Sequence, residues 1–348
     1  MSAKKPSMRD IGKTMGISAV TVSKALAGKP GVSEKLREQV LAKAGELGYV
    51  FPAMKAADAG RSLDIGILIP DRYFEPESYY AVLYKKLVQA LADLGHFGLL
   101  EILKAEDEAA LNLPNLIRSG RADGIILLGE PEKTYYRKTA RAGKPAVFLD
   151  FYDEQANADS VTGDNVYGTY RLTSHLIRQG HTRIGFVGNV HATSSIMDRY
   201  LGYCRAMLTY GYPMKSEWVL SDRADTGLME LKDLQNLPED MPTAFVCNCD
   251  LTARAMIGKL REAGYRVPDD VSVTGFDDFP PEGEGDVPLS TFRIDTDSMV
   301  RMAVKAIVER CGGSREPYGR MVVSGQPVYR ETETTAGRQL IPGRAMQQ

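Results

Sequence analysis

Carboxylates and aromatic rings gather directly after an apolar run that begins at Asp64. The run DIGILI is typical of a buried strand, and five such side chains follow it: Asp71, Tyr73, Phe74, Tyr79 and Tyr80. Aromatic faces stack on the C–H face of a sugar ring, and carboxylate oxygens accept hydrogen bonds from its hydroxyls. The pattern predicts a sugar-binding site. The alternative is that Tyr79 and Tyr80 only begin the following helix and pack in its core.

A second group of residues, near the N-terminus, suits contact with double-stranded DNA. Methyl-bearing side chains fit thymine methyl groups and a lysine fits guanine acceptors, which predicts base contacts by Ala19, Val20 and Lys24. Hydroxyl groups suit phosphates, which position a protein without specifying a sequence; the candidates are Ser18, Thr21 and Ser23.

The elements that would carry this second group form a helix-turn-helix over residues 8–49. Ile11 and Met15 lie four residues apart on one helix face, and Gly16 ends that helix where the backbone must turn. Ser18 caps a second helix and Ser33 a third. In such motifs the second helix enters the major groove. A small helical bundle without a nucleic-acid role is the alternative.

Composition limits the remaining choices. With 348 residues, 43% of them hydrophobic, the chain exceeds one typical domain. It has neither a run near the ~20 apolar residues of a membrane span nor a signal-like N-terminus, so we expect a cytoplasmic protein without a membrane partner. Residues 1–61 carry 11 basic and 5 acidic residues although the whole chain has a net charge of −2. A basic head on an acidic body suits a module that meets phosphates.

The four cysteines follow neither a disulfide pattern nor zinc spacing. We expect buried free thiols, and neither a metal nor another cofactor.

From residue 63 onward, short apolar runs alternate with amphipathic helices, which predicts parallel sheets covered by helices. The predicted strands are 64–69, 97–103, 124–128, 146–150, 183–187, 244–247 and 271–275. The predicted helices are 80–94, 106–118, 135–142, 168–179, 199–210 and 251–262. The alternation restarts after Asp164, so we expect two open sheets with a cleft between them.

The run DIGKTMGISAVTVSKALAGKPGVSEKLREQVLAKAGELGY resembles the headpiece of the lactose/galactose-repressor (LacI/GalR) family without a gap. The likeness continues through DIGILIPD, ADGIIL, GHTRIGFVG, RYLG and VPDDVSVTGFDD. It implies an α/β protein with an all-α helix-turn-helix headpiece and a bilobed core like a periplasmic sugar-binding protein.

The resemblance also implies a domain plan. Residues 1–49 would form the headpiece, 50–62 the hinge or linker, and 63–348 the core for ligand binding and dimerisation. The first lobe would take about 63–162 and 292–325, and the second about 163–291 and 326–345.

For DNA, the resemblance implies a homodimer, or a tetramer, on a pseudo-palindromic operator. The implied contacts are Ser7, Met8, Ser18, Ala19, Val20, Thr21, Ser23 and Lys24. Family hinges wedge a leucine into the minor groove, but Asp58 stands at that position here. A carboxylate cannot act as an apolar wedge, so Met54 or Ala57 would replace it, or the operator is bent less.

For the effector, the resemblance implies a site between the lobes, centred on Arg199 and Asp277, with Asp164 beside the arginine. The family asparagine that contacts ligand is replaced by Cys249, so Asn248 or Asp250 would contribute instead. With the residues after the first strand included, the full predicted set is Asp71, Tyr73, Phe74, Tyr79, Asp164, Arg199, Asn248, Cys249, Asp250, Phe276 and Asp277.

Three functions compete. A transcription regulator, a repressor that responds to a sugar, explains both parts of the chain, and a purine is the alternative effector. A solute-binding protein for sugar transport explains the core but not the headpiece. An enzyme is disfavoured, since the chain lacks the motifs GxSxG, Walker A, HExxH and GxGxxG.

Overall fold

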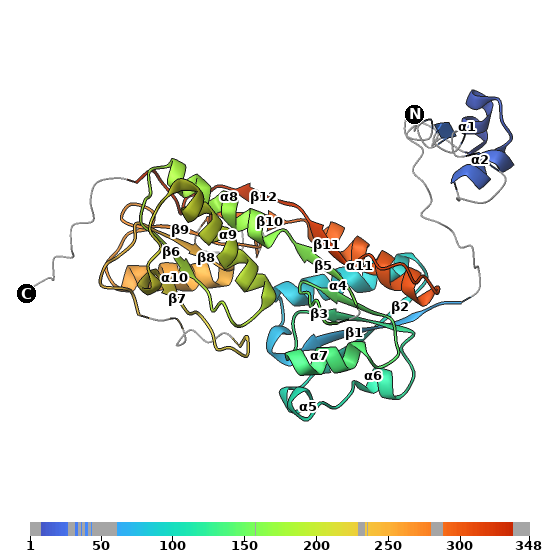
Figure 1. The fold of residues 1–348 in the computed structure, drawn as a ribbon, viewed down its shortest axis with the longest axis horizontal. Coiled ribbons are helices and arrows are strands. Elements are labelled where there is room, and N and C mark those ends of the chain that lie inside the picture. The colour runs from blue at the N-terminus through green and yellow to red at the C-terminus, as the bar shows by residue number, and fades with distance from the viewer. Residues whose placement is uncertain are drawn as a thin grey trace, which may run out of the picture. The chain divides into compact units, whose positions relative to one another are not determined.

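The computed structural model describes residues 8–26, 32–33, 36, 39–40, 43 and 61–336, except 157, 229–233, 235 and 280–287. The chain divides into two units, Met1–Arg61 and Ser62–Gln348, which are drawn in Figure 1. Within the described part of the chain, each helix is too short or too polar to cross a membrane.

Over residues 8–26, the first unit contains two short helices joined by a tight turn, as predicted. Helix α1 is Met8–Met15 and helix α2 is Ala19–Leu26. The turn needs glycine because Gly16 has φ +67° and a Cβ on Gly12 would lie 2.7 Å from the Ile17 carbonyl oxygen. Its small core is formed by Ile11, Val22, Ala25 and Val40.

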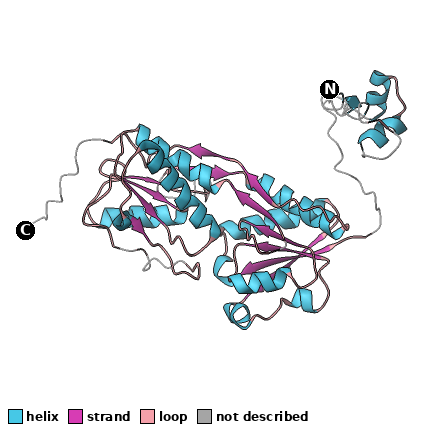
Figure 2. Cartoon of the chain, viewed as in Figure 1, coloured by secondary structure: helices cyan, strands magenta, loops and turns pink. Residues whose placement is uncertain are grey.

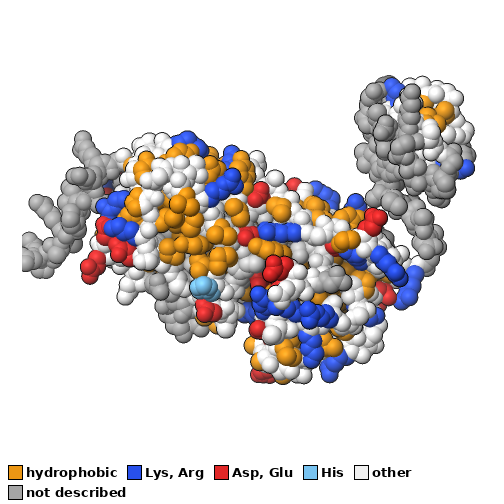
Figure 3. Space-filling view, in the orientation of Figure 1, with side chains coloured by type: hydrophobic (Ala, Val, Ile, Leu, Met, Phe, Trp, Pro, Cys, Tyr) orange, Lys and Arg blue, Asp and Glu red, His pale blue; other side chains and the backbone are white. Residues whose placement is uncertain are grey.

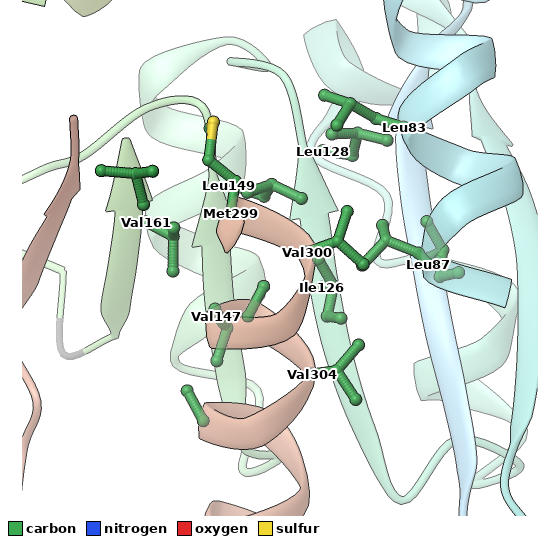
Figure 4. Packing of buried hydrophobic residues seen from close by; sticks show 14 of the residues in the cluster. Leu83, Leu87, Ile126, Leu128, Val147, Leu149, Val161, Met299, Val300 and Val304 are labelled. Carbon is green, nitrogen blue, oxygen red and sulfur yellow. The ribbon is translucent and has the colours of Figure 1, made fainter. Parts of the chain in front are cut away.

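The second unit begins with a six-stranded parallel sheet in the order β11-β5-β4-β3-β1-β2, the core of the first lobe. Its strands are β1 (Asp64–Pro70), β2 (Phe97–Leu103), β3 (Gly124–Leu128), β4 (Ala146–Leu149), β5 (Asp159–Gly163) and β11 (Arg320–Val323). Helices α4 (Tyr79–Asp93) and α11 (Thr296–Cys311) cover one face, and α7 (Lys133–Ala140) covers the other. Figure 4 shows Leu83 of α4 beside Leu128 of β3, and Val300 and Val304 of α11 beside Ile126 of the same strand.

A four-stranded parallel sheet in the order β7-β6-β8-β9 forms the core of the second lobe. Its strands are β6 (Ile184–Val187), β7 (Val219–Leu220), β8 (Ala244–Cys247) and β9 (Ser272–Thr274). Helices α8 (Asn165–Arg178) and α9 (Ser194–Tyr210) pack on one face and α10 (Asp250–Glu262) on the other (Figure 2). Hydrophobic side chains spread over the second lobe on the face seen in Figure 3. Leu201 and Leu208 of α9 are exposed.

The chain passes between the lobes where β5 leads into α8, where β10 (Thr291–Ile294) leads into α11, and where β11 leads into β12 (Gly325–Val328). Strands β10 and β12 pair antiparallel. The predicted fold class, a helix-turn-helix headpiece with a bilobed parallel-sheet core, is confirmed.

One predicted helix, 106–118, is wrong. The structure has two short helices instead, α5 (Ala105–Ala110) and α6 (Asn115–Arg118). Leu111 adopts φ +56°, which ends α5, and Pro114 stands before α6 because proline cannot continue a preceding helix. Among the cysteines, all free, Cys247 is buried as expected, but Cys204, Cys249 and Cys311 are only half-buried.

Candidate functional site

The carboxyl ends of the first-lobe strands carry the polar residues that face the second lobe. The 3-10 turn η1 (Asp71–Tyr73) follows β1, Glu130 follows β3, and Asp150 and Tyr152 follow β4. In open parallel sheets this edge is where ligands bind. The space between this edge and the second lobe is called the cleft below.

Arg199 of α9 is the central cation of the cleft. Its Nε donates to Asn165 Oδ1 at 2.9 Å, its Nη1 to the Asn248 carbonyl oxygen at 2.6 Å, and its Nη2 to Asp277 Oδ1 at 3.0 Å. The guanidinium carbon lies 4.1 Å from the centre of the Phe276 ring. These contacts hold the planar guanidinium in one orientation.

Two carboxylates from opposite lobes approach this arginine. Asp150 of the first lobe accepts a hydrogen bond from Tyr80 Oη at 2.9 Å. Burial raises the pKa of Asp150, and burial raises the pKa of Asp277 to about 7 although Arg199 opposes that shift. Both aspartates adopt left-handed backbone conformations, with φ +73° and +102°. Such strain in non-glycine residues is concentrated at functional sites.

Several buried polar atoms of the cleft have no hydrogen-bond partner among the described residues. They are Tyr73 Oη, Tyr79 Oη, Asp150 Oδ1 and Asn165 Nδ2. A buried polar group without a partner costs about 1–3 kcal/mol, so these atoms indicate a polar ligand. We call these four residues, together with Arg199 and Asp277, the cage. Its members are Tyr73, Tyr79, Asp150, Asn165, Arg199 and Asp277.

A second polar cluster, which also contains an aspartate, an asparagine and an arginine, lies in the second lobe. Asp222 accepts from Arg223 Nη2 at 2.7 Å, from Asn248 Nδ2 at 2.7 Å and from Thr252 Oγ1 at 2.5 Å. Cys249 Sγ lies 3.5 Å from Arg223 Nη2 at its edge. Burial alone would raise the pKa of Asp222, but hydrogen bonds and charge from Arg223 hold it below its usual value. We call these five residues the Asp222 cluster.

Helix α9 also joins the two lobes directly. Glu130 of the first lobe accepts from the backbone N–H and the hydroxyl of Ser194 at 2.7 and 2.8 Å. One turn later, Asp198 accepts from Tyr152 Oη at 2.9 Å and from Arg320 Nη2 at 2.6 Å. These hydrogen bonds connect the two lobes beside the cage.

The structure brings Tyr73, Tyr79, Arg199, Phe276 and Asp277 of the predicted effector set together at the cleft. The other predicted residues either lie away from the cage or form hydrogen bonds with other parts of the fold. Asp71 is exposed, Phe74 packs edge-on against Tyr84, Asp164 caps α8, Asn248 and Cys249 belong to the Asp222 cluster, and Asp250 accepts from Thr291 and Phe279. Their contact with an effector stays a prediction.

Sequence reasoning missed two members of the cage. Asp150 is the last residue of the predicted strand 146–150. Ligands bind at the carboxyl ends of parallel strands, so this position alone could have identified Asp150 as a candidate. Asn165 follows Asp164, which was chosen instead; only the structure shows that Asp164 caps the helix while Asn165 meets Arg199.

In the headpiece, Ser18 caps α2 by accepting from the backbone N–H of Thr21 at 3.0 Å, and the two hydroxyls lie 2.9 Å apart. Ser18 and Lys24 are exposed, Ala19 and Thr21 are half-buried, and Met8 is exposed. The remaining predicted DNA contacts lie outside the described residues: Ser7, Met54, Ala57 and the side chains of Val20 and Ser23. Asp58 lies outside them as well.

Comparison with known proteins agrees with both units. A model of bacterial regulatory proteins of the lacI family matches residues 7–51, and a model of a periplasmic-binding-protein-like domain matches residues 173–333. The maltose regulon regulatory protein MalI of Escherichia coli K12 is 30% identical over 304 residues, 83% of this chain and 87% of MalI. The transcriptional regulator MalR of Streptomyces coelicolor is 27% identical over 94% of this chain and 97% of its own length.

Solved structures give the same result. A complex of the transcriptional regulator CelR with cellobiose has a TM-score of 0.66 at 25% identity and covers 94% of this chain and 100% of its own. The lac repressor dimer bound to operator has a TM-score of 0.64 at 22% identity, covers 95% of this chain and 100% of its own, and shows the shared fold.

A helix-turn-helix unit and a bilobed core with a polar cleft define a DNA-binding transcription regulator with a ligand-binding core, a class that is not enzymatic. The chain belongs to the LacI family of bacterial regulatory proteins.

Proposed function

We propose that this protein is a homodimeric repressor whose effector is a neutral sugar held in the cage. The observation that carries the proposal is the set of unpartnered buried atoms, Tyr73 Oη, Tyr79 Oη, Asp150 Oδ1 and Asn165 Nδ2. The last three belong to residues that interact with Arg199. They offer donors and acceptors from several directions, as the hydroxyls of a sugar ring require. Tyr79 adds an aromatic ring for its C–H groups.

The charges of the cleft favour a neutral ligand. Arg199 is paired with Asp277, and Arg223 is paired with Asp222. The described cage therefore offers no further cation for the phosphate of a sugar phosphate. Related regulators are named for maltose and ribose, which supports a sugar, whereas others are purine repressors.

Effector and DNA would be coupled through lobe closure. A ligand that binds the closed lobes more tightly than the open lobes shifts the protein toward the closed arrangement. The contacts of Glu130 with Ser194 and of Asp198 with Tyr152 belong to the closed arrangement. In a dimer on a pseudo-palindromic operator, this shift would change the affinity of the two headpieces for their half-sites.

Thermal unfolding of the full-length protein with neutral sugars, sugar phosphates and purines tests the effector class. A ligand of the folded state at a hundredfold excess over Kd adds about 2.7 kcal/mol of stability. We expect stabilisation by a neutral sugar. Stabilisation by a purine or a sugar phosphate alone would refute the proposed class.

Binding to operator variants tests the headpiece. Lys24→Ala should cost ~1–3 kcal/mol on the preferred operator and relax the base preference at one position. Lys13→Ala, an exposed lysine on α1, serves as the control that leaves base preference unchanged. An unaltered preference in Lys24→Ala would remove that residue from the set of base readers.

A further inference from the structure

A pocket of about 640 Å³ adjoins the cage at the side where the chain crosses between the lobes. One face of α4 forms its floor through Val82, Leu83 and Lys86, and the starts of α11 and β12 form its rim. Tyr79 and Asp277 belong both to this pocket and to the cage. The two spaces are therefore neighbours with a common wall.

The lining of the pocket combines apolar and hydrogen-bonding groups. Val82 and the ring of Phe279, which meets Tyr79 edge-on at 5.9 Å between ring centres, supply apolar surface. Lys86 Nζ lies 2.7 Å from Thr296 Oγ1 and 2.8 Å from Asp297 Oδ1. This rim presents an ammonium group, a hydroxyl and a carboxylate within reach of one another, which suits the hydroxyl groups of a ring lying on the apolar floor.

The pocket is large enough to matter for ligand size. Small-molecule sites have volumes of about 300–1,000 Å³. A pocket of about 640 Å³ beside the cage therefore has room for a second sugar ring. Thr296, Ser324 and Gly325 are among its lining residues. Two other lining residues form an ion pair, in which Arg293 Nε donates to Asp278 Oδ2 at 2.5 Å.

We propose that the effector is a disaccharide, with one ring in the cage and the second ring in this pocket against Val82, Lys86 and Thr296. The inference rests on the proposed function, because it specifies which neutral sugars the same cleft takes. Tyr79, whose hydroxyl is unpartnered among the described residues, stands at the junction of the two spaces. Its hydroxyl faces the first ring or the linkage between the rings.

Titration calorimetry on the full-length protein tests this with glucose, galactose, maltose, cellobiose, trehalose and lactose. We expect one disaccharide to bind at least a hundredfold more tightly than its constituent monosaccharides. Val82→Trp, which fills the pocket, should weaken that disaccharide at least tenfold and change monosaccharide affinity by less than twofold. Thermal unfolding without ligand verifies that the variant is folded.

Two neighbouring lysines of α4 give a matched pair that does not depend on filling the pocket. Lys86 lines the pocket, whereas Lys85 is exposed on the helix surface. Lys86→Met should weaken the disaccharide about three- to tenfold, and Lys85→Met should leave it unchanged.

The possible failures are distinguishable. If a monosaccharide binds as tightly as every disaccharide, or if Val82→Trp and Lys86→Met leave disaccharide affinity unchanged, the inference is overturned and the sugar-responsive repressor stands. If the wild-type protein binds no sugar of the panel and is stabilised by a purine, the proposed function fails and the inference fails with it.

Discussion

The cage and the Asp222 cluster contain the same kinds of residue but differ in how completely their polar atoms are paired. In the Asp222 cluster, Asp222 accepts from Arg223, Asn248 and Thr252 within the second lobe. In the cage, Arg199 pairs with Asp277, but atoms of four neighbouring residues have no partner among the described residues.

The difference also appears in the titration of the two aspartates. Hydrogen bonds and charge hold the pKa of Asp222 below its usual value despite burial, whereas burial raises the pKa of Asp277 to about 7. A group whose ionised form is fully satisfied contributes to the stability of the fold. Asp277 has one such partner, Arg199, which does not offset the cost of burying its charge, so its ionised form can still gain hydrogen bonds from a ligand. The number of buried polar atoms that lack a hydrogen-bond partner thus distinguishes a cluster that stabilises the fold from one that binds a ligand.

The largest expected effect is the loss of stability in Asp222→Ala. Removing this carboxylate leaves the buried Arg223 guanidinium without its ion pair, which costs about 3–5 kcal/mol. Chemical denaturation measures the loss, and effector affinity of the folded variant should change less than twofold. Asp240→Ala, which breaks an exposed pair with Lys215, should cost at most about 1 kcal/mol. An Asp222→Ala protein as stable as the wild type would contradict the structural role.

Arg199→Met should weaken effector binding in addition to stability, because Asp277 also loses its buried ion pair. It removes the cation between Asp150 and Asp277, and truncating one partner of a buried charge pair costs about 2–5 kcal/mol in binding. Calorimetry with the sugar found in the panel measures this. Arg205→Met, an exposed arginine on the same helix, is the control. Effector affinity within threefold of wild type would exclude Arg199 from the site.

Binding should strengthen as pH rises through about 7. Sugar hydroxyls donate to the ionised form of Asp277, whose pKa is raised to about 7, so affinity should be up to about tenfold higher at pH 8 than at pH 6. Calorimetry at both pH values checks this. Asp277→Asn should abolish the slope, and a slope that persists in that variant would point to another group.

The unliganded core should respond to pH in the opposite direction. An aspartate with a raised pKa holds its proton more tightly in the folded state than in the unfolded state. Asp277 and Asp250, whose pKa burial raises to about 8, therefore reduce stability as pH rises from about 4 to about 8. Denaturation at pH 5 and pH 8 without ligand should give the higher free energy of unfolding at pH 5.

The smallest expected effect is at Cys249, which lies at the edge of the Asp222 cluster. Replacing it with asparagine restores the family residue that contacts ligand. We expect Cys249→Asn to strengthen effector binding by about 0.5–1.5 kcal/mol, one net hydrogen bond. Cys247→Ala, at a buried position in β8, should alter stability and leave affinity unchanged. Unchanged effector affinity in Cys249→Asn would place this position outside the effector's reach.

Much of the fold follows from local patterns. The bounds of β2, β3 and β8 agree with the predicted strands, since each is a short hydrophobic run. The run DSVTG gave no such signal, and it is the buried strand β5 because its neighbours β4 and β11 enclose it. The helix predicted over 106–118 is wrong because Pro114 interrupts it and caps a separate short helix.

The sequence by itself determined the helix-turn-helix, the alternation of strands and helices, the family and the two residues, Arg199 and Asp277, at the centre of the cleft. Those features rest on neighbours along the chain or on motifs. Only the tertiary structure decided that Asn165, not Asp164, meets Arg199, that Asp150 joins the cage, and that Asn248 serves the fold. Arg199 and Asp277 are 78 residues apart, and Asn248 and Asp222 are 26 apart. Whether a buried polar atom is paired depends on such distant partners, which a local pattern does not contain.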